Sequence, residues 1–97
     1  LKTYKVLSGS MEPEYHVGSV VYVEKSSIDD IEVGDVITFY INDNTVVTHR
    51  VIDKDDDTES FRTKGDANEI EDGGSVAYDK VVGKVVLNVP YLGYILR

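Results

Sequence analysis

A serine of the segment SGSMEP, residues 8–13, and His49 carry side chains that could together cleave an acyl bond. The segment contains two serines, Ser8 and Ser10. Gly9 permits positive φ or close backbone approach, and Pro13 fixes its own φ and removes a donor, so the segment predicts a turn. Such a turn can present a hydroxyl and nearby backbone N–H groups at one point, as an acyl-transfer nucleophile and its oxyanion site require. An ordinary polar turn explains the same residues.

A serine hydroxyl is weakly acidic and needs a base, for which His49 is the candidate. His49 lies in a β-branched run, residues 46–52, where alternation places it on one face with Val47 and Val51. An imidazole on a buried face needs a polar partner, and a hydrogen-bonded core histidine without a catalytic role fits the same pattern. The other histidine, His16, lies in a polar stretch and is predicted to be on the surface.

A histidine base also needs an acid that fixes its tautomer and stabilises the imidazolium. A polar, glycine-rich loop is predicted over residues 64–75 and contains two candidates, Asp66 in Lys-Gly-Asp and Asp72 in Glu-Asp-Gly. Either carboxylate can reach His49 if the loop folds back over the sheet, and either can equally be a turn residue. The residues alone leave both aspartates open.

Two other chemistries leave weaker patterns. An enzyme with a histidine base loses activity on acidification through about pH 6–7, whereas a flat pH profile there would point to a lysine base, with Lys64 as the first alternative.

Residues 53–57 read Asp-x-Asp-x-Asp, like the opening of a calcium loop. Thr58 replaces the glycine that such a loop requires, and Lys64 replaces its bidentate acid, so calcium is disfavoured. The sequence therefore predicts no metal and no cofactor.

Composition limits the class of protein. A length of 97 residues suits one domain with a modest core, and 41% hydrophobic residues indicate a globular chain. Abundant valine, seven Tyr and only two Pro favour strands. The net charge of −8 argues against nucleic acid as a partner, because phosphate binding needs clustered Lys and Arg. Without cysteine there is neither a disulfide framework nor a thiol nucleophile, and the compartment is left open.

Strand and turn signals alternate along the chain. The predicted strands cover residues 20–23, 36–41, 46–52, 60–63 and 80–89. Asn-Asp-Asn at 42–44 predicts a hairpin turn, the acidic stretch 53–59 predicts a solvated hairpin tip, and Gly83 predicts a bulge or bend. At most one helical turn is expected, within residues 24–31. The pattern predicts an all-β fold, either a bent antiparallel sheet or a partly open β-barrel.

Three motifs occur in order, with strand-like spacers and a PYxGY ending, over about residues 6–93: SGSMEP, VTHRV and TKGDANEIED. Together they resemble type I signal peptidases, in the branch found in archaea, in the eukaryotic endoplasmic reticulum and in some Gram-positive bacteria. The resemblance implies that Ser10 is the nucleophile and that His49 replaces the lysine base of the ordinary bacterial branch. It implies that Asp66 and Asp72 support catalysis, without choosing between them, and it implicates Ser8 more weakly in the oxyanion site.

The same resemblance implies a serine endopeptidase that removes N-terminal signal peptides from translocated preproteins, cutting after small residues at sites of the Ala-x-Ala type. It implies a β-rich catalytic domain, here residues 1–97, held by a membrane anchor on the extracytoplasmic or lumenal side. No apolar run approaches the ~20 residues that span a bilayer, and both ends look cut, so we expect the anchor to be missing from this chain. The expected partners are preprotein signal peptides and a membrane, and not nucleic acid.

Two other functions fit parts of the pattern. A self-cleaving repressor-type protease shares a related β-fold and uses a Ser-Lys pair. It is disfavoured because His49 occupies the position of the base and no DNA-binding segment is present. The non-enzymatic alternative is a catalytically silent β-domain that serves assembly or substrate capture in a membrane complex. Such a domain has no chemical reason to keep Ser10, His49 and an acidic loop together, and labelling of Ser10 by a serine-directed reagent would distinguish the two.

Overall fold

Seven strands form one antiparallel sheet in the computed structural model, which describes residues 1–90. The strands are β1 (Lys2–Lys5), β2 (Val20–Glu24), β3 (Val36–Asn42), β4 (Thr45–Asp55), β5 (Ser60–Lys64), β6 (Val76–Ala77) and β7 (Val81–Val89). Three short 3₁₀-helices accompany them, η1 (Gly9–Met11), η2 (Ile28–Asp30) and η3 (Tyr78–Lys80). Within residues 1–90 no helix has the length and apolar character needed to span a membrane. The predicted all-β fold is confirmed.

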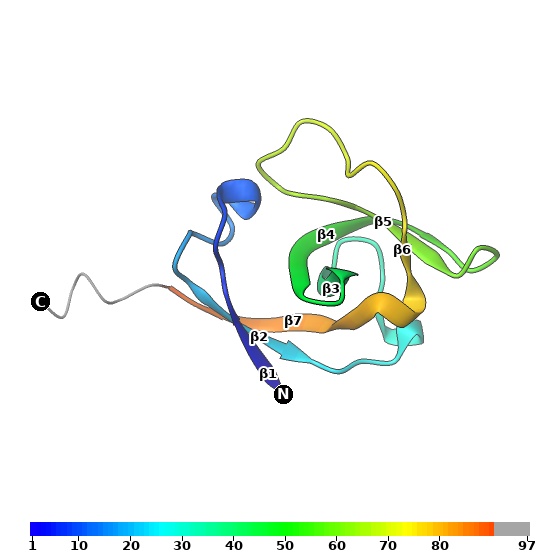
Figure 1. The fold of residues 1–97 in the computed structure, drawn as a ribbon, viewed down its shortest axis with the longest axis horizontal. Coiled ribbons are helices and arrows are strands. Elements are labelled where there is room, and N and C mark those ends of the chain that lie inside the picture. The colour runs from blue at the N-terminus through cyan, green and yellow to red at the C-terminus, as the bar shows by residue number, and fades with distance from the viewer. Residues whose placement is uncertain (91–97) are drawn as a thin grey trace, which may run out of the picture.

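The sheet is strongly bent around β3. Its strand order is β1-β2-β7-β3-β4-β5-β6, and Figure 1 shows β1, β2 and β7 on one side of β3 with β4 and β5 on the other. β7 changes register against β3 next to Gly83, and a bulge of this kind increases the local twist. A Cβ atom at Gly83 would lie 2.1 Å from the carbonyl oxygen of Glu24, so only glycine lets the two backbones approach. The predicted irregularity at Gly83 is confirmed.

The five predicted strands correspond to β2, β3, β4, β5 and β7, with ends that differ by a few residues. The glycines that precede β2 and β3, Gly18 and Gly34, have φ of 91° and 100°, which explains the turns that feed these strands. The sequence pattern missed β1 and β6. Both are edge strands, and the Lys-Thr-Tyr-Lys of β1 and the two residues of β6 carry little hydrophobic signal. The PYxGY ending of the resemblance extends into residues 91–97, outside the described residues.

The hydrophobic core fixes the strand that carries the candidate base. Its buried members are Ile31, Ile37, Phe39, Val51, Phe61 and Val76. His49 is paired across β3 and β4 with Ile37, and alternation places it on the same face as Val51. Both hydrophobic neighbours are almost fully buried. His49 therefore projects from a closely packed part of the sheet, where its position is set by core packing.

Candidate active site

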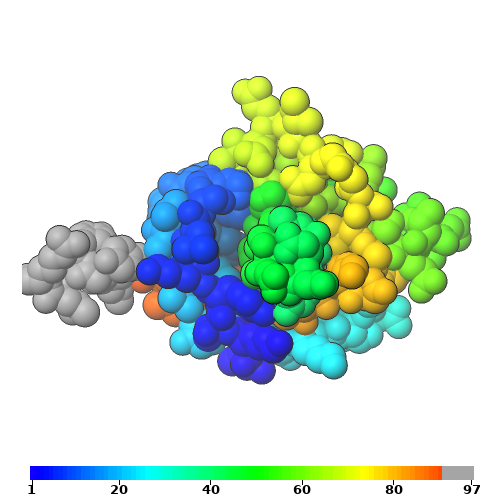
Figure 2. Space-filling view, viewed as in Figure 1, coloured from blue at the N-terminus to red at the C-terminus, as the bar shows by residue number. Residues whose placement is uncertain are grey.

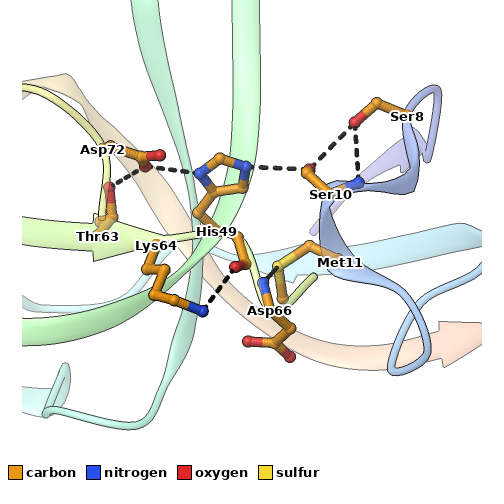
Figure 3. Close-up of polar contacts among 9 residues, drawn as sticks. Ser8, Ser10, Met11, His49, Thr63, Lys64, Asp66 and Asp72 are labelled. Carbon is orange, nitrogen blue, oxygen red and sulfur yellow. Dashed lines mark hydrogen bonds and ion pairs between the residues drawn. The ribbon is translucent and has the colours of Figure 1, made fainter. Parts of the chain in front are cut away.

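Ser10 lies in η1, a single turn that Ser8 caps. The Ser8 hydroxyl oxygen is 3.5 Å from the Ser10 backbone nitrogen, which donates to it, and 3.1 Å from Ser10 Oγ. The next side chain, Met11, is 2% exposed and anchors the turn in the protein interior. The short turn thus buries Met11 and leaves the Ser10 hydroxyl directed toward His49, as Figure 3 shows.

Ser10, His49 and Asp72 form a continuous chain of hydrogen bonds (Figure 3). His49 Nε2 is 3.0 Å from Ser10 Oγ, and His49 Nδ1 is 2.6 Å from Asp72 Oδ2. An ionised carboxylate only accepts, so we assign the proton to Nδ1, which leaves Nε2 to accept from the Ser10 hydroxyl. The short Nδ1–Oδ2 distance is typical of a charge-assisted hydrogen bond. This is the relation that a nucleophile, its general base and an orienting acid require.

The imidazole of His49 is largely shielded from water. Its side chain is 11% exposed, and the ring of Phe39 meets it edge-on with 6.5 Å between ring centroids. A pocket of about 520 Å³ lies beside His49 and Asp72, and Val47 and Val76 are among its lining residues. Apolar walls of this kind strengthen the electrostatic interaction between imidazole and carboxylate, because they lower the local dielectric.

Asp66 has a different partner. Arg50 Nε donates to Asp66 Oδ1 at 2.8 Å and Arg50 Nη2 donates to Oδ2 at 2.7 Å, while Nη1 donates to the carbonyl of Gly34 at 2.7 Å. These guanidinium hydrogen bonds lower the pKa of Asp66, against the opposing effect of partial burial, and the same contact raises the pKa of Arg50. Of the two aspartates that the sequence left open, the structure brings Asp72 to His49 and pairs Asp66 with Arg50.

The backbone around Asp66 holds the nucleophile turn in place. The N–H of Ala67 donates to the carbonyl of Ser10 at 2.8 Å, and the N–H of Asp66 lies 3.4 Å from the sulfur of Met11. A Cβ atom at Gly65 would lie 2.7 Å from the Ser10 carbonyl oxygen and 3.0 Å from Ser10 Cβ. Figure 2 shows the N-terminal segment (blue) and the loop after β5 (yellow) on either side of the β3–β4 hairpin (green). The sequence reasoning missed this supporting role of Gly65 and Ala67, because both residues read simply as part of a turn.

Lys64, the alternative base, lies close by but has another partner. Its Nζ donates to the carbonyl of Gly65 at 3.1 Å. The side-chain hydrogen-bond partners of Ser10 Oγ in the described part of the chain are Ser8 and His49. His16 is on the surface, as predicted, with 63% of its side chain exposed and a 2.6 Å contact to Glu12. The resting geometry thus favours His49 over Lys64 as the group that accepts the Ser10 proton.

The Asp-rich stretch forms a turn. Asp55 Oδ1 accepts the backbone N–H groups of Asp57 and Thr58, as in an Asx-type turn at a hairpin tip. Asp56 accepts the hydroxyl of Tyr78 at 2.6 Å. Among residues 1–90 no three His, Cys, Asp or Glu side chains converge as metal ligands.

The Arg50–Asp66 pair yields a prediction about stability. Asp66→Asn should lower the free energy of unfolding at pH 7 by about 2 kcal/mol, roughly 10 °C in Tm for a chain of this size, because it leaves a partly buried guanidinium without its anion. The pKa of Asp66 is lowered in the folded state, so the stability from this pair is complete above the unfolded value near 3.8 and is lost as the pH falls through the lower folded value. The difference in Tm between parent and variant should therefore be constant above about pH 5 and shrink below about pH 4.

Asp53→Asn is the matched control for this measurement. Asp53 contacts Arg62 at 3.5 Å, but both side chains are about half exposed, and ion pairs of this kind contribute little. Thermal unfolding followed by circular dichroism between pH 3 and 8 would compare the three proteins. Equal Tm values for Asp66→Asn and Asp53→Asn at pH 7 would contradict the supporting role of the Arg50–Asp66 pair.

Comparison with known proteins places this geometry in context. A family model described as "Signal peptidase, peptidase S26" matches residues 1–61, a range that includes Ser10 and His49. Signal peptidase I W of Bacillus subtilis (strain 168) is 46% identical over 79 residues, which cover 78% of this chain and 42% of that protein. The signal peptidase complex catalytic subunit SEC11C of Homo sapiens is 35% identical over 101 residues, covering 93% of this chain and 53% of that protein. The chain spans about half the length of these relatives.

Proposed function

This chain belongs to the signal peptidase, peptidase S26, family, and from this premise we propose that it carries the catalytic site of a serine endopeptidase that removes N-terminal signal peptides from translocated preproteins. The observation that carries the proposal is the hydrogen-bonded series from Ser10 Oγ through His49 to Asp72, with distances of 3.0 and 2.6 Å. A silent domain would have no chemical reason to keep this series. A repressor-type Ser-Lys enzyme would pair its serine with a lysine, whereas Ser10 pairs with His49.

In the proposed reaction Ser10 Oγ attacks the carbonyl carbon of the residue before the cut. His49 Nε2 takes the hydroxyl proton as the C–O bond forms, and the Asp72 carboxylate stabilises the resulting imidazolium through Nδ1–H. His49 then returns that proton to the leaving amine as the C–N bond breaks, which leaves an ester on Ser10. The same imidazole then takes a proton from water as the water oxygen attacks the ester carbon. His49 gives this proton to Ser10 Oγ as the ester C–O bond breaks, which restores the Ser10 hydroxyl and releases the new carboxyl group.

The negative charge on the tetrahedral intermediate requires donors beside Ser10. We propose the backbone N–H of Ser10 for this role and, more weakly, the Ser8 hydroxyl. The long 3.5 Å contact between these two groups can be exchanged for contacts to an oxyanion, and the Ser8 hydroxyl lies 3.1 Å from the attacking oxygen.

The setting of the reaction is also part of the proposal. We propose residues 1–97 as a single catalytic domain of a membrane-anchored protein, working on the extracytoplasmic or lumenal side. Its substrates would be signal peptides with small residues at the first and third positions before the cut. The net charge of −8 agrees with a peptide substrate better than with nucleic acid. The human relative is named as a catalytic subunit of a signal peptidase complex, and we extend only its peptidase activity to this chain.

Cleavage in detergent of a signal-peptide substrate with an Ala-x-Ala site tests the proposed function, with mass spectrometry to identify the bond that is cut. We expect one cut after the last alanine, and no cut when that alanine is replaced by a bulky residue such as Leu. A version that carries a membrane anchor should be assayed beside the chain itself. If the anchored version leaves the peptide intact and a serine-directed reagent does not label Ser10, the domain is catalytically silent and the proposal is wrong.

A further inference from the structure

We propose that Thr63 is a positioning residue of this site, whose hydroxyl holds the Asp72 carboxylate in the orientation that His49 needs. Thr63 Oγ1 donates to Asp72 Oδ2 at 2.6 Å, and this is the same oxygen that accepts from His49 Nδ1, also at 2.6 Å (Figure 3). The inference rests on the proposed function, because it takes Asp72 as the acid that orients the base. Thr63 would be the fourth side chain of the site, after Ser10, His49 and Asp72. Unlike a catalytic residue, it touches neither the substrate nor the reacting atoms.

The position of the Thr63 hydroxyl is set by a strand and not by a loop. Thr63 lies in β5, has no exposed surface, and is paired across the sheet with Val51 of β4. Paired residues share a face, so Thr63 and Val51 lie on the face from which His49 projects, one alternation further along β4. A β-branched side chain is stiff at χ1. The donor is therefore presented from a fixed point beside the imidazole.

Asp72, by contrast, lies in the loop between β5 and β6 and is followed by two exposed glycines, Gly73 and Gly74. Thr63 holds this part of the loop at two points, because its carbonyl also accepts the backbone N–H of Asp72 at 2.9 Å. With both the main chain and one carboxylate oxygen attached to β5, the remaining rotation of the Asp72 side chain is restrained. Oδ2 is then directed at Nδ1 before substrate binds, which is the preorganisation that catalysis requires.

A merely structural threonine would make a different prediction. If Thr63 only filled space in the core, valine of nearly the same shape would serve as well, and would remove a buried hydroxyl at little cost to packing. If its hydroxyl positions Asp72, valine fails and serine succeeds, because serine keeps the donor and loses only a methyl group. The two substitutions thus separate shape from hydrogen bonding at one position.

The test compares the full-length parent with Thr63→Val and Thr63→Ser. The rate at which a fluorophosphonate phosphonylates Ser10, with loss of fluoride, is measured together with signal-peptide cleavage. We expect Thr63→Val to slow phosphonylation and kcat by about tenfold with KM little changed, and Thr63→Ser to stay within about threefold of the parent. The low-field proton NMR signal of His49 Nδ1–H should be retained in the serine variant and be weakened or moved upfield in the valine variant.

Each outcome decides the inference. Phosphonylation of Ser10 in Thr63→Val at the parental rate, or equal losses in both variants, would overturn it. If Thr63→Val does not fold, the parent itself provides the test, since a hydroxyl proton held by Asp72 exchanges slowly with water and a rapidly exchanging one would contradict the proposal. The reagent does not depend on the natural substrate. Slower labelling of Thr63→Val beside a parent that cuts no signal peptide would leave the role of Thr63 standing and reject the proposed function.

Discussion

Ser10→Ala should reduce the rate of signal-peptide cleavage by about 10⁴- to 10⁶-fold, the loss found when the nucleophile of a serine protease is removed. The reason is geometric. Ser10 Oγ is the hydroxyl at 3.0 Å from His49 Nε2, so its removal leaves the base without the group that it activates. Steady-state cleavage of the Ala-x-Ala substrate would check this, with labelling of the parent and the variant by a serine-directed reagent measured in parallel. Ser26→Ala, a substitution outside the described site, is the control and should cleave at the parental rate.

His49→Ala belongs to the same prediction and should lose a similar factor, because nucleophile and base act as a unit and their losses do not add. His16→Ala is its matched control, since that histidine is exposed and pairs with Glu12. Cleavage that survives in His49→Ala at a rate near that of the parent would contradict the assignment and point to Lys64 as the base.

Asp72→Asn is expected to lower kcat by about 10³- to 10⁴-fold while the protein stays folded. An asparagine side chain can present its NH₂ group to Nδ1, which would move the imidazole proton to Nε2 and leave no acceptor for the Ser10 hydroxyl. The 2.6 Å contact from Nδ1 to Oδ2 makes His49 directly sensitive to this change. Cleavage kinetics measured well below the Tm of each variant would separate this effect from unfolding.

Asp66→Asn provides the contrast for Asp72→Asn. Its carboxylate is held by Arg50 at 2.7 and 2.8 Å, so its loss should lower stability and reduce kcat by no more than about tenfold. We therefore expect opposite effects: Asp72→Asn should lose cleavage rate at normal stability, whereas Asp66→Asn should lose stability at a nearly normal rate. If Asp66→Asn loses more rate than Asp72→Asn when both are folded, Asp66 is the acid that supports catalysis and our assignment is wrong.

The local sequence determined most of the elements. β-Branched runs bounded by glycine or by Asn-Asp-Asn predicted β3 and β4 and the hairpin between them, since strand alternation and turn chemistry act over a few residues. β1 and β6 were not predicted, because an edge strand can form from polar or very short segments once a neighbouring strand supplies hydrogen bonds. The bend at β7 was signalled by Gly83, but the close approach of Glu24 that requires glycine there was not.

The candidate site, too, contains residues that the sequence indicated and residues that it did not. Residue type and the resemblance of the three motifs were enough to select Ser10 and His49 as the candidate nucleophile and base. They were enough to limit the acid to the loop that holds Asp66 and Asp72. They did not suggest a role for Arg50 or Thr63, although both residues lie within the quoted motifs.

Only the tertiary structure decided between the two aspartates. They are six positions apart in one loop, and nothing in their flanking residues states which of them turns toward β4. The path of that loop depends on a contact far along the chain, of Ala67 with Ser10, and on the contact of Thr63 with Asp72 across the loop itself. Local preferences, which act over a few residues, determine strands and turns. The side chain that reaches His49 is determined by how the bent sheet brings β5 and the nucleophile turn to the same loop.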